Sequence, residues 1–306
     1  MGLGGAALDE RIVYANGHGP DVRYPLALVN VTNRCNLACA HCFVYREDNP
    51  NLSTGPRGEP DDDQMCEILG ALRDRHGIAF MLWMGGEPLL RPRLLERGVR
   101  LFAANHVVTN GTRPLIDLGP DVLYVVSLDG PEDVNDAVRG PGTYNRVMRT
   151  LNAIPESFAS RVQVQCTVTR RNQDRLEELV AAVAATRAAW MTFSFYVPSA
   201  GGGDDTEAGL AWPTLEDRMV AVEEVMRLKG AYPGFVRNRR RSLELMAPDL
   251  APAVTASCLP HRLLLPLYLD GDRFTTPFCC YGNDVDCSRC GAWVVFEMAA
   301  LAASAN

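Results

Sequence analysis

Three closely spaced cysteines, Cys35, Cys39 and Cys42, are the residues of this chain best suited to chemistry, in the stretch NVTNRCNLACAHCFV at residues 30–44. Thiolates are soft ligands, and three of them so close together favour zinc or an iron–sulfur cluster. A structural zinc site takes four protein ligands, but the next cysteine, Cys66, lies inside a predicted helix. A cubane cluster held by three cysteines leaves one iron open for a substrate or cofactor. The spacing therefore indicates an open iron–sulfur site.

A second group of cysteines surrounds two short apolar runs joined by Asp270-Gly271, which predict a β-hairpin with a type I′ turn. Its members are Cys258, Cys279, Cys280, Cys287 and Cys290. The last two have the CxxC spacing that is typical of metal ligands. A hairpin with such a pair fits a fully ligated iron–sulfur cluster or a zinc ribbon.

Short β-type runs alternate with helical patterns over the first two thirds of the chain. The predicted strands are residues 26–32, 79–84, 106–109, 122–128, 162–168 and 190–196. The predicted helices include residues 62–76, 91–104, 173–187 and 214–229, and residues 199–209 are expected to form an exposed loop. This alternation favours an α/β fold with a parallel sheet in an open or partial barrel. The three cysteines follow the first strand, at the edge where such folds place their chemistry.

Three glycine-containing motifs end the next predicted strands: GGEP at Gly85, TNG at Thr109 and SLDG at Ser127. Each motif alone is a common turn sequence. In this order behind CNLACAHC, they resemble the CX3CX2C signature and strand-end motifs of the radical S-adenosylmethionine (SAM) superfamily, over about residues 24–200. The resemblance implies a partial (β/α)6 barrel and a [4Fe–4S] cluster on the three cysteines. It also implies that SAM binds the open iron through its amino and carboxylate groups.

The resemblance further implies which side chains contact SAM. A histidine replaces the usual aromatic residue beside the adenine, and the GGE segment meets the methionyl ammonium through carbonyls and the carboxylate. Polar residues at the next two strand ends are candidates for the ribose or the methionyl end, and an arginine is expected to pair with the SAM carboxylate. These expected contacts are His41, Gly85, Gly86, Glu87, Asn110, Ser127, Asp129 and Arg139.

The second cysteine group resembles the SPASM and twitch extensions of many radical SAM enzymes, which hold an auxiliary [4Fe–4S] cluster. A single cluster of the twitch kind is therefore expected in a small C-terminal Cys-rich lobe. Four ligands are needed and five cysteines are present, so Cys279 and Cys280 compete for one position, and we favour Cys279. A zinc ribbon stays open as the alternative.

Side-chain alternation along the later strands gives an independent indication of a ligand site. One face of each strand is polar and the other apolar. Because helices cover the outside of such a barrel, the polar faces should point inward, which implies a polar ligand. Cys166, on an apolar face, and Cys66 are expected to be core thiols. The inward residues are Ser127, Asp129, Gln163, Gln165, Thr167, Thr192, Ser194 and Tyr196.

Composition sets the broad class of the protein. The 306 residues are 47% apolar and 22% charged, which is typical of a globular chain, and the net charge of −7 argues against nucleic-acid or anionic-membrane partners. No apolar run could span a membrane and no signal peptide is recognisable, so a cytoplasmic location is expected. The expected parts are an N-terminal extension (1–24), a radical SAM core (25–200), a linker with helices (201–257) and the auxiliary cluster lobe (258–306).

By resemblance, the chain is expected to be an enzyme that cleaves SAM reductively to a 5′-deoxyadenosyl radical. The radical would take a hydrogen atom from a small polar metabolite in natural-product or cofactor biosynthesis, and the auxiliary cluster would assist net oxidation or bond formation. A reductant such as flavodoxin or ferredoxin is the expected partner. The polar lumen and the absence of an extra N-terminal domain motivate the small substrate. No catalytic acid or base is assigned, and the residues expected near the barrel mouth are Tyr45, Gln165, Tyr196 and Arg262.

Three other functions stay open. In a peptide maturase, an acidic leader could bind the patch formed by Arg237, Arg239, Arg240 and Arg241, although arginine runs are commonly solvated helix faces. Adenosyl transfer to an isoprenoid is suggested by the RYPL lead-in and the late cysteines, while the polar lumen argues against it. A non-catalytic iron–sulfur or zinc protein is the last alternative, and iron content with SAM cleavage would separate it from an enzyme.

Overall fold

The chain was analysed as a computed structural model, which describes residues 4–46, 49, 58–201 and 203–304. Small parts of the expected N-terminal extension, of the expected core at 25–200 (residues 47–48 and 50–57), of the loop at 199–209 and of the C-terminal lobe lie outside the described residues. In the described part, one sheet of nine strands has the order β1-β9-β8-β2-β3-β4-β5-β6-β7. None of the described helices is long and apolar enough to cross a membrane.

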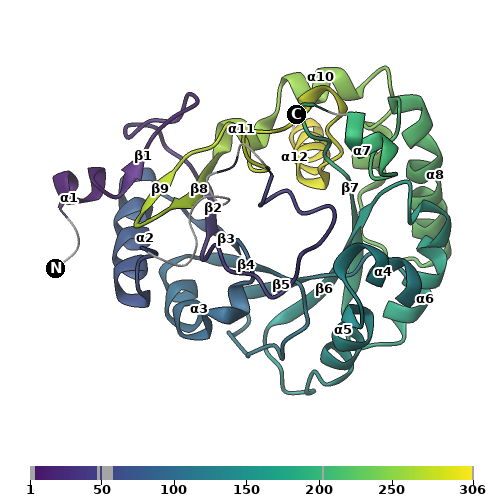
Figure 1. Ribbon diagram of the computed structural model, residues 1–306, viewed down its shortest axis with the longest axis horizontal. Helices are drawn as coiled ribbons and strands as arrows, with labels where there is room; N and C mark the ends of the chain where they lie inside the picture. Colours follow the sequence, from purple (N-terminus) through teal and green to yellow (C-terminus); the bar gives the residue numbers. More distant parts are fainter. Residues whose placement is uncertain (1–3, 47–48, 50–57, 202, 305–306) are drawn as a thin grey trace.

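Six neighbouring strands form the parallel segment that the sequence predicts, and each observed bound lies within about two residues of its prediction. They are β2 (Leu26–Asn30), β3 (Phe80–Met84), β4 (Ala104–Thr109), β5 (Val122–Ser127), β6 (Arg161–Val168) and β7 (Trp190–Phe195). Each pairs in parallel with the next. Figure 1 shows these strands as an open arc with α2, α3, α5, α6 and α8 outside it. The expected α/β partial barrel is confirmed.

The strands β6 and β7 have one face packed in the hydrophobic core and another face directed toward the inside of the barrel. On β6, Val162, Val164 and Cys166 pack in the main hydrophobic core, whereas Gln165 and Thr167 line an internal cavity. On β7, Ser194 lines the same cavity, and Tyr196 follows at its rim. The other two polar residues expected to point inward from β6 and β7 form hydrogen bonds to neighbouring strand residues. Gln163 accepts a hydrogen bond from the Trp190 indole, and Thr192 accepts one from Gln165.

Helix termini follow local capping signals. Asp61 caps α2 (Asp62–His76) in a reciprocal capping box with Gln64, and Gly77 ends the helix with φ of 73°. Thr214 and Asp217 form the same box at α8 (Leu215–Ala231). The other helices are α1 (Gly5–Asp9), α3 (Pro92–Gly98), α4 (Glu132–Arg139), α5 (Thr143–Asn152), α6 (Leu176–Ala184), α7 (Gly203–Glu207), α9 (Arg240–Glu244), α10 (Ala251–Ala256), α11 (Leu259–Leu263) and α12 (Trp293–Ser304).

Two local predictions are wrong. The helix predicted at 91–104 ends at Gly98 and continues as a short 3₁₀ turn, because Ala104 already pairs with β3 as the first residue of β4. The loop predicted at 199–209 contains α7, anchored where the Asp205 carboxylate accepts hydrogen bonds from the Ser199 backbone and the Tyr196 hydroxyl. Tertiary pairing overrode the local sequence signal in both segments.

The C-terminal hairpin extends the barrel sheet. β8 (Leu264–Asp270) pairs in parallel with β2, β9 (Arg273–Thr275) pairs antiparallel with β8, and β1 (Ile12–Val13) pairs with β9. Asp270 pairs with Arg273, so the turn residues are Gly271 and Asp272, and of these only Gly271 has a positive φ, 63°. The predicted type I′ turn is therefore wrong, since a positive φ at the first turn residue alone is typical of type II′.

The rest of the C-terminal segment reaches the opposite edge of the barrel. The Phe195 N–H donates to the Gly291 carbonyl at 2.9 Å, and the Trp293 N–H donates to Ser194 Oγ at 3.1 Å. The segment thus runs from β2 to β7 across the open side of the arc (Figure 1). The division into a core and a lobe stays a prediction, but the two parts share one sheet.

Candidate active site

One cavity at the carboxyl ends of the barrel strands contains the first cysteine group. Cys35, Cys39 and Cys42 line one wall, and polar side chains of β6 and β7 line another. In Figure 1 the purple segment that follows β2 lies inside the arc. Burial raises the pKa of all three thiols, and none of the chain's ten cysteines, all in the described part, forms a disulfide. Three soft donors beside a polar cavity fit an iron–sulfur cluster with a ligand next to it.

Hydrogen bonds within the cysteine segment and to two neighbouring elements hold it in place. The Ala40 N–H donates to the Val138 carbonyl at the end of α4, and the Cys42 N–H donates to the Cys39 carbonyl in a tight turn. The Asn110 amide, after β4, lies 3.9 Å from Cys35 Sγ and also donates to Asn36 Oδ1 at 2.9 Å. Asn110 and Ser127 both line the cavity, at the places expected of them.

The glycine pair after β3 brings that strand against the cysteine segment. Gly85 has φ of 129°, a conformation that favours glycine, and the Gly86 N–H donates to the Thr32 carbonyl at 2.8 Å. A Cβ added to Gly86 would overlap the Arg34 carbonyl. Both glycines line the cavity, so their missing side chains allow the close approach and leave backbone exposed to a ligand.

Glu87 is enclosed between the ends of two strands. Its carboxylate is 0% exposed and accepts hydrogen bonds from Thr109 Oγ1 at 2.7 Å, the Asn110 N–H at 2.8 Å and the Leu89 N–H at 2.9 Å. Burial raises the pKa of this carboxyl, and the three donors oppose the rise. Glu87 braces the end of β3 against β4, and it is absent from the described residues that line the cavity.

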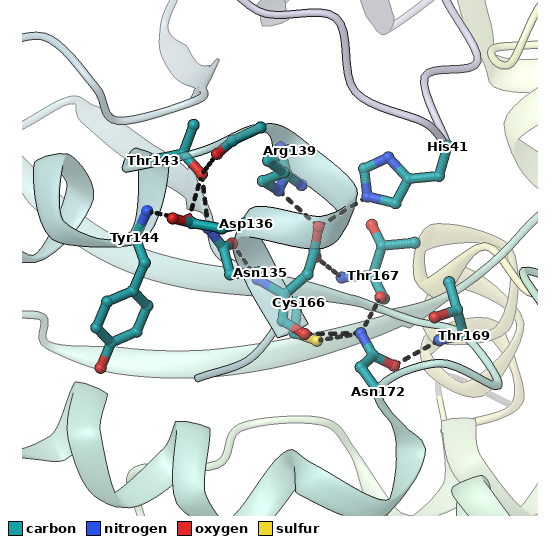
Figure 2. Close-up of polar contacts among 12 residues, drawn as sticks. His41, Asn135, Asp136, Arg139, Thr143, Tyr144, Cys166, Thr167, Thr169 and Asn172 are labelled. Carbon is teal, nitrogen blue, oxygen red and sulfur yellow. Dashed lines mark hydrogen bonds and ion pairs between the residues drawn. The ribbon is translucent and has the colours of Figure 1, made fainter. Parts of the chain in front are cut away.

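Asp129 is likewise enclosed, at the centre of a network beside the cysteine segment. Its Oδ2 accepts hydrogen bonds from His41 Nε2 at 2.7 Å and Arg139 Nε at 2.6 Å, and its Oδ1 accepts one from the Thr167 N–H at 2.8 Å. Figure 2 shows His41 and Arg139 converging on one point. Burial alone would raise the Asp129 pKa, but Arg139 and His41 hold it below its usual value. His41 and Arg139 line the cavity, while Asp129 supports them from behind.

Four cysteines of the second group lie together. Burial raises the pKa of Cys290 to about 12, and the neighbouring Cys279, Cys258 and Cys287 thiolates add to the rise. Burial also raises the pKa of Cys287 to about 11, with contributions from Cys279 and Cys258. Cys280 has some of the same neighbours, because Cys279, burial, and the Cys258 and Cys290 thiolates raise its pKa, and it also packs against a smaller apolar cluster around Tyr268. The described residues contain no group of three or more His, Cys, Asp or Glu side chains placed to hold a single metal ion.

The two cysteine groups meet at the cavity through residues that the sequence analysis missed. Phe43, after Cys42, packs against Tyr281 with ring centroids 4.5 Å apart and the ring planes tilted by 49°, and both line the cavity. Arg46 lies over the Tyr196 ring and donates to the Asp284 carbonyl at 3.0 Å. The only sequence signal that could have identified Phe43, Arg46 and Tyr281 as cavity residues is that each lies within a few positions of a cysteine. Of the residues expected near the mouth, Gln165 and Tyr196 line the cavity, but Tyr45 and Arg262 are not among its described lining residues.

The sequence profile of the Radical SAM superfamily matches residues 29–183, just over half of the chain. The chain belongs to this superfamily. The match spans the segment from the end of β2 to α6, which includes the cysteine triplet and the three strand-end motifs.

Two curated relatives illustrate the sequence similarity. Mycofactocin maturase MftC of Mycolicibacterium smegmatis is 32% identical over 194 residues, which cover 59% of this chain and 47% of the relative. Pre-heme d1 synthase of Dinoroseobacter shibae is 32% identical over 167 residues, covering 51% of this chain and 39% of the relative. The chain thus spans about half the length of the curated relatives it matches.

Solved structures share the fold. Streptococcus suis SuiB bound to S-adenosylmethionine aligns with a TM-score of 0.61 at 15% identity, covering 81% of this chain and 59% of SuiB. The structure of anSMEcpe with bound AdoMet and Cp18Cys peptide aligns with a TM-score of 0.60 at 16% identity, covering 89% and 79%. Identities this low establish a common architecture.

Proposed function

We propose that this protein is a radical SAM enzyme that holds a [4Fe–4S] cluster on Cys35, Cys39 and Cys42. The supporting observation is that these three thiols share one cavity with the glycine pair after β3 and with polar strand faces. The bound cluster and SAM supply the reductive cleavage that generates a hydrogen-abstracting radical. The chain's own residues shape the site around them.

Each wall of the cavity has a separate task in this proposal. Asn110 and Ser127 present polar groups to the cofactor, and Gly85 and Gly86 present backbone carbonyls. Gln165, Thr167 and Ser194 orient the polar groups of a substrate. Phe43 and Tyr281 close the side toward the C-terminal segment and exclude water from a reactive intermediate.

We assign an auxiliary [4Fe–4S] cluster to Cys258, Cys279, Cys287 and Cys290. The mutual influence of the thiolates supports a shared site. Cys280 has the same thiolate neighbours but also packs against a separate apolar cluster, which favours Cys279 as the fourth ligand. With four protein ligands, this cluster is suited to accepting or relaying electrons. Zinc in this site is the competing assignment, and metal analysis distinguishes the two.

The substrate class has two candidates. The polar cavity wall favours a small polar metabolite. A peptide is favoured by the names of similar proteins, since MftC is a maturase and a SuiB structure contains the precursor peptide SuiA. The arginine patch is a weak leader site, because Arg239 pairs with Glu297, and Arg240 and Arg241 both pair with Glu244. The remaining member, Arg237, stacks over the Trp190 ring.

Anaerobic reconstitution tests the proposed chemistry. The wild-type protein should bind about eight irons per chain for two cubanes and, with dithionite, form 5′-deoxyadenosine from SAM. The Cys35→Ala variant should lose this activity. Cys66→Ala is the matched control, because Cys66 lies on α2 away from the cavity, and it should behave as wild type. An iron-loaded wild-type protein that forms no 5′-deoxyadenosine would contradict the proposal.

The substrate class needs a second experiment. Extracts of a host that carries the wild-type protein should be compared with extracts that carry Cys35→Ala, for both small metabolites and peptides. A metabolite that accumulates only with the variant supports the small substrate, whereas an unmodified peptide that accumulates supports maturation.

A further inference from the structure

Asp129 joins three parts of the molecule through one buried carboxylate. It is 0% exposed, and its partners are His41 of the cysteine segment, Arg139 at the end of α4 and the Thr167 backbone of β6. Its own backbone is also fixed, because its N–H donates to Asn135 Oδ1 at 3.1 Å and its carbonyl accepts from Asn172 Nδ2 at 2.8 Å. Such complete enclosure leaves little freedom for the carboxylate to turn toward a ligand.

Arg139 connects this carboxylate to the cysteine segment. Its side chain is only 8% exposed, its Nε donates to Asp129, and it lines the same cavity as Cys39. The Ala40 N–H, next to Cys39, donates to the carbonyl of Val138, the residue before Arg139. The pair therefore places one positive and one negative charge beside the segment that carries a proposed cluster ligand. Burial matters because water does not screen such charges well.

We propose that Asp129 and Arg139 set the reduction potential of the cluster on Cys35, Cys39 and Cys42. Arg139 acts through its charge, and Asp129 is the positioning residue that holds the guanidinium beside the cysteine segment. This inference rests on the proposed function, because it requires that cluster. His41 shares the same Asp129 oxygen and so fixes the cysteine segment to the same support.

The expected direction follows from charge. Reduction adds an electron to the cluster, so a nearby cation favours the reduced state, whereas a nearby carboxylate disfavours it. Groups next to metal ligands commonly change the properties of a metal site when they are altered. Removing the cation and removing the anion should therefore have opposite effects, which loss of packing alone does not produce.

Potentiometric titration of the reconstituted protein without SAM, followed by electron paramagnetic resonance, tests this. Asp129→Asn should move the midpoint potential of the SAM-site cluster to a more positive value, and Arg139→Gln to a more negative one. The double variant should return toward wild type, because the removed charges cancel. Iron content and thermal melting establish that each variant is loaded and folded.

Asp136→Asn is the matched control. Asp136 lies on the same helix, but its carboxylate binds the Tyr144 and Gly142 N–H groups and the Thr143 hydroxyl (Figure 2). Its substitution should leave the potential unchanged. Shifts of the same sign in Asp129→Asn and Arg139→Gln, no shift in loaded variants, or an equal shift in Asp136→Asn would overturn the inference.

Failure of the inference is distinguishable from failure of the proposed function. If the wild type assembles a cluster but the variants do not move its potential, only the redox role is overturned. If the wild type assembles no cluster at Cys35, Cys39 and Cys42, the proposed function fails, and the redox role with it. Should Asp129→Asn not fold, Arg139→Gln decides alone: a more negative potential supports the role, and an unchanged or more positive one overturns it.

Discussion

The two cysteine groups are held in different ways. The first lies on one short segment after β2, and the ends of β3, β4 and β5, with α4, surround it. The second is spread from Cys258 to Cys290, before and after the β8–β9 hairpin, and comes together where the C-terminal segment crosses the open side of the barrel. The first group therefore depends on a preformed barrel, and the second on the docking of one long segment.

This difference distinguishes what the spacing of cysteines in the sequence achieves from what tertiary contacts must add. Sequence spacing alone brings Cys35, Cys39 and Cys42 together, while the barrel decides what faces them. In the second group Cys279 and Cys280 are adjacent and Cys287 and Cys290 are three residues apart, but Cys258 lies about twenty residues before them. The pairing of β8 with β9 and β2 and the contact of Gly291 with β7 bring these parts together. The two groups should accordingly fail in different ways when single residues are changed.

The largest expected effect is on SAM cleavage, which should depend on the first cysteine group and not on the second. Cys39→Ala should lower SAM cleavage by more than about 100-fold, because changes in groups that only support metal ligands already cost 10–100-fold. Cys258→Ala should retain 5′-deoxyadenosine formation, because its site lies outside the SAM cavity. Dithionite-driven SAM cleavage measures both variants. Equal loss in the two would show that the sites do not act separately.

Iron content should sharpen the assignment within the second group. Cys279→Ala should lose about four irons per chain, the content of one cubane, whereas Cys280→Ala should keep them. The reason is that Cys279, Cys258 and Cys290 pack against the main hydrophobic core, whereas Cys280 packs against a separate small cluster around Tyr268. Iron and sulfide analysis after anaerobic desalting gives the answer, and the reverse pattern would reassign the ligand to Cys280.

Arg218 on α8 should stabilise the second group more than the first. It is buried and donates to the carbonyls of Cys290 at 2.9 Å and Met246 at 3.2 Å, and burial lowers its pKa to about 10, so it stays charged at neutral pH. Arg218→Leu should reduce the free energy of unfolding by about 2–4 kcal/mol, since it leaves buried carbonyls unpaired. Urea denaturation measures this, and auxiliary iron should be released first.

A surface residue of the same helix provides the comparison for that variant. Arg227 is exposed and pairs with Glu177 and Glu224. Arg227→Leu should change the unfolding free energy far less than Arg218→Leu does, as exposed ion pairs contribute little. Similar losses in Arg218→Leu and Arg227→Leu would contradict a special role of Arg218.

The smallest expected effect concerns Asp136, which fixes the turn between α4 and α5. Hydrogen bonds from Tyr144, Thr143 and Asn135 outweigh burial and lower the pKa of Asp136. Its contribution is therefore present above the unfolded pKa near 3.9 and is lost as pH falls below it. Asp136→Asn should cost about 1 kcal/mol at pH 7, because the group is partly exposed. The difference from wild type, measured by urea midpoints, should shrink as pH falls below about 4, and a constant difference would contradict this.

Local signals explain which parts of the fold were predictable. The capping box at Asp61 and the glycine at position 77 define α2 at its predicted bounds, and side-chain alternation locates the six barrel strands. Parallel pairing of β8 with β2 joins residues more than two hundred positions apart, and the sequence carries no local signal for it. The predicted separation of the hairpin from the barrel sheet reflects that limit.

The candidate site shows the same division at the level of side chains. The positions of Asn110 and Ser127 at the cavity follow from strand ends meeting at one edge of a parallel sheet. The directions of the Glu87 and Asp129 carboxylates depend on donors from other strands and helices, such as Thr109, Thr167 and Arg139. Motif position therefore predicted where these residues lie and not what they touch.

The sequence by itself determined the superfamily, the barrel strands and the cysteine triplet, because these depend on local spacing, strand periodicity and ordered turn motifs. Only the tertiary structure decided that Glu87 and Asp129 are braces, that Cys279 and Cys280 pack in different clusters, and that Tyr281 completes the cavity. Buried polar groups must find partners wherever the packed chain provides them, and those partners come from distant segments.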